Sequence, residues 1–171
     1  MPGANIVTTN EPATGALVDA YRARPYIQKD QGVFIMDCDI WLHSDEYFDK
    51  IRKSLLGEMA IDGALMLFES DNPRYSYAQL DDEGLVIATA EKRVISPYAI
   101  AGGYYVSSPD VLDEAARAVF DKPLDESRPE YYVSYMYDEL VKMGGKVLGI
   151  MGDFTSFGTP QELAAYETRG Q

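Results

Sequence analysis

Two acidic residues, Asp37 and Asp39, follow an apolar stretch at a spacing that could hold a metal ion. The stretch is residues 32–36 (GVFIM), and only Cys38, the one cysteine of the chain, separates the two acids. Such an apolar run is typical of a buried strand, and ligands bind beyond the carboxyl ends of strands in α/β sheets. The residues leave two interpretations open: metal binding, or a polar strand end that leads into a helix at Ser44.

Strands and helices are predicted to alternate along the chain. Apolar and β-branched runs predict strands at residues 5–9, 32–36, 63–70, 75–89 (two strands around a turn), 101–108 and 146–151. Helices are predicted at residues 15–23, 44–55, 108–120, 130–145 and from 159 onward. Their expected N-caps are Thr14, Ser44, Ser108 and Thr159, the last within a capping box that runs to Glu162.

This alternation predicts an α/β fold of three layers around a mixed, mostly parallel sheet. Residues 32–36 are expected inside the sheet, because their apolarity is too continuous for a strand with a solvated face. In the second helix, Phe48, Ile51 and Leu55 are spaced three and four residues apart and predict its buried face. The length of 171 residues favours one domain, residues 1–171.

Composition and charge exclude several kinds of partner. The chain has 15 Lys and Arg against 28 Asp and Glu, so its formal net charge is −13. Such a chain lacks the basic face that nucleic-acid binding needs, and anionic lipid would repel it. A phosphorylated ligand would therefore need a local basic group or a divalent cation. We see no membrane span and no signal peptide, and one cysteine allows no internal disulfide, so we predict a cytoplasmic location.

Four stretches occur in an order that resembles the sugar-phosphate nucleotidyltransferases, whose Rossmann-like fold is shared with the GT-A glycosyltransferases. Residues 32–42 (GVFIMDCDIWL) resemble the strand that ends in the metal-binding Asp of that family, and Asp39 is the better match because it precedes an apolar triplet. Residues 11–21 (EPATGALVDAY) resemble its base-binding loop and helix. Residues 73–106 resemble its segment from substrate hairpin to Glu-Lys to Gly-Tyr-Tyr, and residues 157–163 (FGTPQEL) resemble its closing Gly-Thr-Pro-Glu motif.

The resemblance implies roles for individual residues. Asp39 would act in catalysis by holding Mg²⁺ (or Mn²⁺) between phosphates of the two substrates, and Lys92 would contact the acceptor phosphate. Glu91 would accept hydrogen bonds from a hydroxyl group of the substrate. The other substrate-binding residues would be Thr14 and Gly15 beside the base and Gly102 and Gly103 beside the sugar ring. Without the resemblance, Glu91 and Lys92 are interpreted as solvated loop charges and Thr14-Gly15 as a helix start.

The chain departs from the family pattern at two places. The family begins with a strand and a Gly-rich loop that carries Arg and, later, Pro-Lys to the triphosphate, and the sequence contains no such loop. The first strand–helix units of the family have no match, so the fold is expected to be N-terminally incomplete. Ser156 stands where many members have a second metal-binding Asp, and Asp153 is a candidate substitute.

The resemblance implies a nucleotidyltransferase-like protein, which transfers a nucleotidyl group from an NTP to a sugar 1-phosphate or a similar phosphorylated small molecule for activated-sugar and polysaccharide synthesis. One alternative is a GT-A glycosyltransferase in which Asp37-Cys38-Asp39 binds Mn²⁺ and a nucleotide sugar. Another is a truncated, non-catalytic domain that binds a partner. Because residues 32–36 would border the unmatched strand, we expect self-association or a partner chain that completes the sheet, and no nucleotidyl transfer by the chain alone.

Overall fold

One long buried strand, β6, organises the main sheet. The computed structural model describes residue 6 and residues 8–169, and its main sheet has the strand order β5-β4-β6-β3-β7, with β1 also paired to β6. The strands are β1 (Val33–Met36), β3 (Gly63–Glu69), β4 (Tyr77–Leu80), β5 (Val86–Ala90), β6 (Tyr98–Val106) and β7 (Val147–Met151). One edge of β6 pairs with β3, and its other edge pairs first with β4 and then with β1.

The sheet is mixed, as predicted, but the prediction that it is mostly parallel is wrong. Within the described residues, β3 and β7 form the one parallel pair, whereas β1–β6, β3–β6, β4–β5 and β4–β6 are antiparallel. A parallel neighbour requires a crossover connection, usually a helix. Between β3 and β6 the chain contains the β4–β5 hairpin and no helix, so β6 returns antiparallel to β3.

A second, two-stranded sheet was not predicted from the sequence. It pairs β2 (Ile40–His43) with β8 (Asp153–Ser156) in antiparallel order. β2 begins directly after the turn at residues 37–39, which joins it to β1. Asp37 and Asp39 therefore lie between two strands and not directly before a helix.

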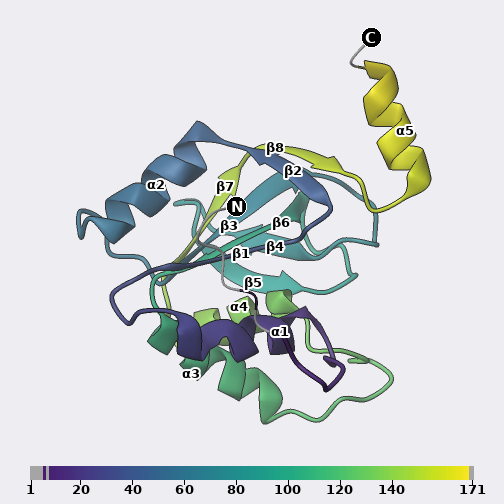
Figure 1. The fold of residues 1–171 in the computed structure, drawn as a ribbon. Coiled ribbons are helices and arrows are strands. Elements are labelled where there is room, and N and C mark those ends of the chain that lie inside the picture. Colours follow the sequence, from purple (N-terminus) through teal and green to yellow (C-terminus); the bar gives the residue numbers. More distant parts are fainter. Residues whose placement is uncertain (1–5, 7, 170–171) are drawn as a thin grey trace.

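Helices cover both faces of the main sheet, which confirms the three-layered α/β fold (Figure 1). They are α1 (Ala16–Ala23), α2 (Asp45–Leu55), α3 (Pro109–Phe120), α4 (Val133–Lys142) and α5 (Pro160–Arg169), with a short 3₁₀ helix at Arg24–Tyr26. In Figure 1, α1, α3 and α4 lie on one side of the sheet, α2 lies on the other, and α5 projects from the rest of the molecule. Among the described residues, no helix is long and apolar enough to cross a membrane.

Local sequence signals explain where two of these helices begin. The side chain of Ser44 accepts a hydrogen bond from the backbone N–H of Tyr47 (3.3 Å), and that of Ser108 accepts one from Val111 (3.2 Å). Both predicted N-caps are therefore confirmed. Helix α4 is shorter at both ends than the predicted residues 130–145. It begins after a bend at Glu130, and it ends at Lys142, before Gly144, whose backbone has a positive φ of 87°.

The apolar core lies on both faces of β3. Leu65 and Leu67 belong to the larger core, which α1, α3 and α4 cover, while Ala64 and Met66 belong to the smaller core beneath α2. All four side chains are fully buried. Successive residues of a strand point to opposite faces, so a strand between two helical layers must be apolar at every position.

The predicted buried face of α2 is only partly correct. Ile51 is buried, but Phe48 and Leu55 are exposed, and Tyr47 is fully buried in their place. The Tyr47 hydroxyl donates to the carbonyl of Ala64 in β3 (3.2 Å). This bond and the ring of Tyr47 turn α2 so that Tyr47 and Ile51, and not the predicted stripe, face the sheet.

β1 is an edge strand, so the prediction that residues 32–36 lie in the middle of the sheet is wrong. Among the described residues it pairs with β6 alone, and the side chains of Phe34 and Met36 are 41 % and 53 % exposed. In the part of the chain that the structure describes, the apolar run therefore forms an edge of the sheet, as the resemblance implied, and is not buried on both faces. The predicted strand at residues 5–9 is absent at residues 6, 8 and 9, while residues 5 and 7 lie outside the described part.

Candidate active site

The candidate site lies where β6 exchanges one neighbouring strand for another. Ala99 of β6 is paired with Tyr77 of β4, whereas Gly103 is paired with Met36 of β1. Between them, the backbone of Gly102 has a positive φ of 79°, which glycine adopts with little strain. The pairing of β6 with β3 also shifts register here. This bulge separates the ends of β4 and β1, in keeping with the tendency of bulges to lie next to binding sites.

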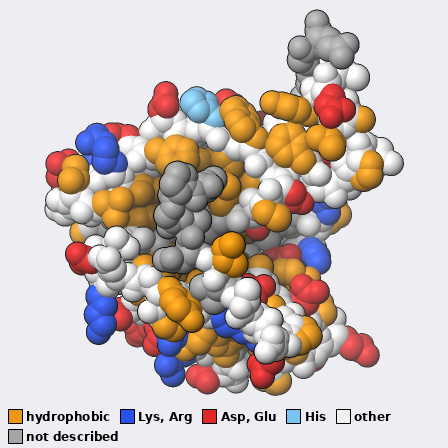
Figure 2. All heavy atoms as spheres, in the orientation of Figure 1, with side chains coloured by type: hydrophobic (Ala, Val, Ile, Leu, Met, Phe, Trp, Pro, Cys, Tyr) orange, Lys and Arg blue, Asp and Glu red, His pale blue; other side chains and the backbone are white. Residues whose placement is uncertain are grey.

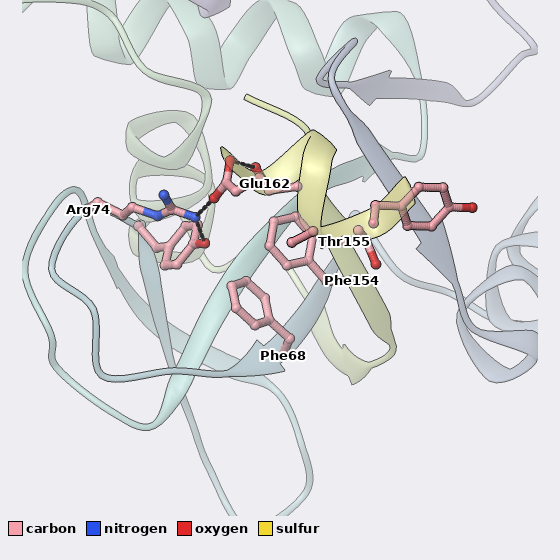
Figure 3. A pocket seen from close by; sticks show the side chains of 9 residues that line it. Phe68, Arg74, Phe154, Thr155 and Glu162 are labelled. Atoms are coloured by element: carbon pink, nitrogen blue, oxygen red, sulfur yellow. Dashed lines mark hydrogen bonds and ion pairs between the residues drawn. The ribbon is translucent and has the colours of Figure 1, made fainter. Parts of the chain in front are cut away.

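Three adjoining cavities form a cleft at this point, since Arg74 and Tyr75 line all three. The Glu91 cavity, about 310 Å³, is lined by residues that include Asp37, Ser76, Glu91, Tyr132 and Ser134. The Asp39 cavity, about 260 Å³, is lined by residues that include Asp37, Asp39, Gly102, Gly158 and Glu162. The Phe154 cavity, about 290 Å³, lies between β8, α5 and the loop that carries Arg74 (Figure 3).

The carboxylate of Asp37 lies in the space that Gly102 leaves free. The backbone N–H of Asp37 donates to the carbonyl of Gly102 (3.1 Å), and a Cβ atom at Gly102 would collide with Oδ2 of Asp37. Burial of this carboxyl group, followed by the negative charges of Asp39 and Glu91, raises the pKa of Asp37. A cation bound beside Asp37 and Asp39 would relieve this repulsion.

Asp39 is held by the segment between β8 and α5. Its carbonyl accepts a hydrogen bond from the backbone N–H of Phe157 (2.8 Å), and its Oδ2 lies 2.9 Å from where a Cβ atom of residue 158 would be. The candidate second ligand, Asp153, is paired with His43 at the far end of β8 and does not line the Asp39 cavity. Within the described residues, no group of three or more His, Cys, Asp or Glu side chains is placed to hold a metal ion by itself.

Glu91 is fixed in the cleft by two serines from different elements. Its Oε2 accepts a hydrogen bond from Ser134 of α4 (2.7 Å) and another from Ser76, which precedes β4. Both serines line the Glu91 cavity. Sequence reasoning missed them, because a serine gives no signal of contact with an acid that is 15 or 43 residues away.

Lys92 lies at the rim of the Glu91 cavity. Its Nζ donates to the hydroxyl of Tyr132 (2.9 Å) and lies 4.7 Å from the centre of that ring. This hydrogen bond raises the pKa of Lys92. Its backbone has a positive φ of 50°, the one such value for a non-glycine residue in the described part of the chain. Lys92 does not line the Glu91 cavity itself, but it is hydrogen-bonded to Tyr132, which does.

Thr14 and Gly15 contact another part of the chain. The predicted N-cap at Thr14 is wrong: Gly15, with a φ of 126°, is the N-cap of α1 and offers no side chain. The carbonyl of Thr14 accepts a hydrogen bond from the N–H of Tyr131 (2.7 Å), and a Cβ atom at Gly15 would collide with the Tyr131 carbonyl. Glycine is needed for this close approach, which places the next residue, Ala16, in the lining of the Glu91 cavity.

The two glycines predicted to make room for a sugar ring have different surroundings. Gly102 lines the Asp39 cavity, with the Asp37 carboxylate beside it. At Gly103, the space for a side chain is already taken by Leu42 of β2, whose Cδ1 lies 2.7 Å from the position of a Cβ atom. The need for glycine at residue 103 is therefore explained by packing between the two sheets.

No match was found among models of known protein families or among curated protein sequences. Solved structures do resemble the fold. A nucleoside-diphosphate-sugar pyrophosphorylase from Vibrio cholerae aligns with a TM-score of 0.74 and 19 % identity, over 92 % of this chain and 66 % of that protein. A putative glucose-1-phosphate thymidylyltransferase from Bacillus anthracis, solved with a sucrose, aligns with a TM-score of 0.70 and 17 % identity, over 94 % of this chain and 62 % of that one.

A third similar structure is an inositol-1-phosphate CTP transferase from T. maritima, with a TM-score of 0.63 and 16 % identity, over 92 % of this chain and 62 % of that protein. The chain therefore has the α/β fold of these nucleotidyltransferases. It spans slightly less than two thirds of the length of each of the three proteins. At identities below 20 %, the likeness shows the fold and leaves the activity to be argued from the site.

We predict that Gly102→Ala will destabilise the protein more than Gly84→Ala. The two glycines have nearly equal φ values, 79° and 80°, so an alanine should meet a similar backbone penalty of about 1–2 kcal/mol at either position. A Cβ atom at Gly84 would meet nothing within 4 Å, whereas at Gly102 it would displace the Asp37 carboxylate. Urea unfolding of both variants measures the difference, and equal losses of stability would show that Asp37 does not occupy this space.

Proposed function

We propose that this protein binds a phosphorylated sugar or a similar small molecule in the cleft and that it is a cytoplasmic nucleotidyltransferase of activated-sugar or polysaccharide synthesis. The observation that carries the proposal is that Glu91, held by two serines, faces the same cleft as Asp37 and Asp39. A carboxylate fixed in this way suits the hydroxyl groups of a sugar. The similar fold of solved nucleotidyltransferases supports the assignment.

In this proposal the residues have separate roles. Glu91 accepts hydrogen bonds from sugar hydroxyl groups, and Lys92 turns from Tyr132 to contact the phosphate of the acceptor. The nucleotide base lies near Thr14 and Gly15, at the start of α1, while Gly102 leaves room beside the sugar. Transfer to the acceptor then depends on alignment of the two substrates and on neutralisation of their charge.

Asp39, with Asp37 beside it, is the proposed site for Mg²⁺ or Mn²⁺. The two carboxylates line one cavity, and their mutual repulsion contributes to the raised pKa of Asp37, so their chemistry fits a hard divalent cation. When bound, such a cation supplies neutralisation of phosphate charge. The chain's own acids bind and orient it.

A GT-A glycosyltransferase is the second candidate function. Asp37 and Asp39 both line the Asp39 cavity, which favours this candidate. In a GT-A glycosyltransferase, both acids of an Asp-x-Asp pair would bind the cation and the nucleotide sugar. The two candidates differ in how much Asp37 contributes. In the nucleotidyltransferase proposal Asp39 is the principal ligand, whereas a glycosyltransferase would depend on both acids.

The proposal predicts that Lys92→Ala weakens binding of glucose 1-phosphate and leaves binding of glucose nearly unchanged. Loss of one charge-assisted contact should cost about 1.5–3 kcal/mol, or roughly 10- to 150-fold in Kd. Calorimetric titration with both ligands in the presence of Mg²⁺ measures this. Arg93→Ala removes the same charge from the adjacent exposed residue and is the control. The proposed role of Lys92 is wrong if its variant binds both ligands as the parent protein does.

For the metal, we expect Asp39→Asn to weaken Mn²⁺ binding by about tenfold or more, equivalent to about 1.4 kcal/mol, and Asp37→Asn to weaken it less. The reason is the place of Asp39 next to the segment that leads into α5, where the closing motif resembles that of the nucleotidyltransferases. Titration of each variant with Mn²⁺ by calorimetry or electron paramagnetic resonance decides the order. Equal losses would favour the glycosyltransferase, and no loss in either variant would remove the metal site.

We also propose that the edge of β1 to which no described strand is paired takes up a second copy of the chain. Phe34 and Met36 of β1 and Phe48 of α2 are exposed, and Figure 2 shows hydrophobic side chains between α2 and the neighbouring strands. An unpaired edge with apolar side chains favours addition of another strand, and two such edges are self-complementary across a two-fold axis. The net charge of −13 opposes this association, so it should strengthen with salt.

Sedimentation at low micromolar concentration and increasing salt is expected to show a dimer. Because the sequence contains no Gly-rich loop with Arg and Lys for the triphosphate, we expect no pyrophosphate release from an NTP and glucose 1-phosphate unless a partner chain supplies that loop. Met36→Glu should shift the protein to a monomer, because it places a charge on the edge. Met143→Glu, at a residue that is 46 % exposed at the end of α4, is the matched control and should leave the dimer intact. A parent protein that is monomeric at all salt concentrations and active by itself would contradict this proposal.

A further inference from the structure

The cleft contains one cation among many acids. Its lining includes Asp37, Asp39, Glu91 and Glu162, whereas Arg74 is the only Lys or Arg among the described residues that line the three cavities. Because Arg74 lines all three, its guanidinium can reach a ligand in any of them. An anionic ligand in a protein of net charge −13 would be repelled by most of this surface.

Among the described residues, the guanidinium of Arg74 forms hydrogen bonds through one of its three nitrogens. Its Nη2 donates to the hydroxyl of Tyr75 and to Oε1 of Glu162, and its carbon lies 4.6 Å from the centre of the Tyr75 ring. Among the described residues, Nε and Nη1 donate to no protein acceptor, and the side chain is 45 % exposed. Figure 3 shows Arg74 reaching across the Phe154 cavity to Glu162. Most of its donors are therefore available to a ligand.

The loop beneath Arg74 is fixed, so the side chain alone has to move. The backbone N–H of Arg74 donates to Oδ1 of Asn72 (3.1 Å), and the N–H of Asn72 donates to Ser70 (3.1 Å). The hydroxyl of Tyr77, in β4, donates to the Asn72 carbonyl (2.8 Å). Arg74 thus turns on a well-anchored backbone.

Glu162 can release Arg74 without loss of its own structural role. Its Oε2 accepts hydrogen bonds from the backbone N–H of Thr159 (3.1 Å) and from the Ser156 hydroxyl (3.0 Å), while the side chain of Thr159 accepts from the Glu162 N–H (3.2 Å). These bonds form the predicted capping box that begins α5. The ion pair uses the other oxygen, Oε1, and exposed ion pairs of this kind contribute little to stability.

We propose that Arg74 binds the phosphate group of the ligand in the cleft and that it does so by exchanging Glu162 for that phosphate. The inference rests on the proposed function for the identity of the whole ligand, a phosphorylated small molecule, but the anion site itself depends only on Arg74 and Glu162. A phosphate group can accept two parallel hydrogen bonds from the guanidinium fork, whereas Glu162 accepts from a single nitrogen. Glu162 therefore competes with the ligand for Arg74.

Inorganic phosphate is the probe for this site, with Kd measured by calorimetry. Arg74→Ala should weaken phosphate binding by about tenfold or more. Glu162→Gln should strengthen it by about 2- to 5-fold, the size of an exposed ion pair, because glutamine retains an acceptor for the capping box but cannot pair with arginine. Arg52→Ala, on α2 and outside the cleft, removes the same charge and should change nothing.

A double-variant cycle separates competition for Arg74 from a general effect of charge. If Glu162 acts through Arg74, then Glu162→Gln gives no gain in the Arg74→Ala background. An equal gain in both backgrounds, or phosphate binding that is unchanged by Arg74→Ala, would overturn the inference. It would also be overturned if phosphate bound to neither the parent protein nor the Glu162→Gln variant.

These outcomes are distinct from failure of the proposed function. If Lys92→Ala weakens glucose 1-phosphate binding while Arg74→Ala does not affect inorganic phosphate, the inference about Arg74 is wrong and the function stands. If Arg74→Ala and Glu162→Gln shift phosphate binding as expected while glucose 1-phosphate binds no better than phosphate, the anion site stands and the proposed sugar substrate falls.

Discussion

The change of partner along one edge of β6 is the constraint on which the cleft depends. β4 and β1 pair with the same edge, so they must occupy successive parts of it, and the backbone between them has to leave the regular ladder. Gly102 provides this departure with its positive φ of 79°. Because it has no side chain, the same residue leaves the space in which the Asp37 carboxylate lies. The departure of β6 from the regular ladder and the position of Asp37, a candidate metal ligand, thus both depend on Gly102.

The electrostatics of the cleft follow from this arrangement. Burial raises the pKa of Asp37, and the nearby charges of Asp39 and Glu91 raise it further. Glu91 is kept in place by Ser76 and Ser134. A surface with this much negative charge can receive a phosphate only if positive charge is supplied within it. The proposed divalent cation beside Asp39 would be one source, and the Arg74 side chain is another that the protein already contains.

Structural features that depend on residues close together in the sequence could be predicted. Those that depend on contacts between residues far apart in the sequence could not. Ser44, Ser108 and the capping box at residues 159–162 were predicted correctly because each acts within its own first helical turn. The apolar run of β1 by itself predicted a strand inside the sheet, because such a run does not reveal how many strands flank it; only the unmatched family strand indicated an edge. The same distinction explains Thr14, whose backbone pairs with Tyr131 across more than a hundred residues, an interaction that no local pattern signals.

The residues of the candidate site also differ in whether the sequence alone could identify them. The motifs singled out Asp39, Glu91, Lys92 and Gly102, and all four lie in or beside the cleft, although their roles remain predictions. Ser134 and the Arg74–Glu162 pair were not singled out, since each contributes by meeting a residue far away in the sequence. The composition gave one general indication of a residue such as Arg74, because an acidic chain that binds phosphate needs a local positive charge.

The central claim is that this cleft binds a phosphorylated sugar, and chemical-shift mapping tests it most directly. The measurement follows the backbone amides of the nitrogen-15-labelled protein during titration with glucose 1-phosphate and Mg²⁺. The account predicts that the largest shifts gather around Ser76, Glu91, Gly102 and Ser134, and that glucose alone produces much smaller ones. Shifts confined to another surface, or no shifts at saturating ligand, would contradict it.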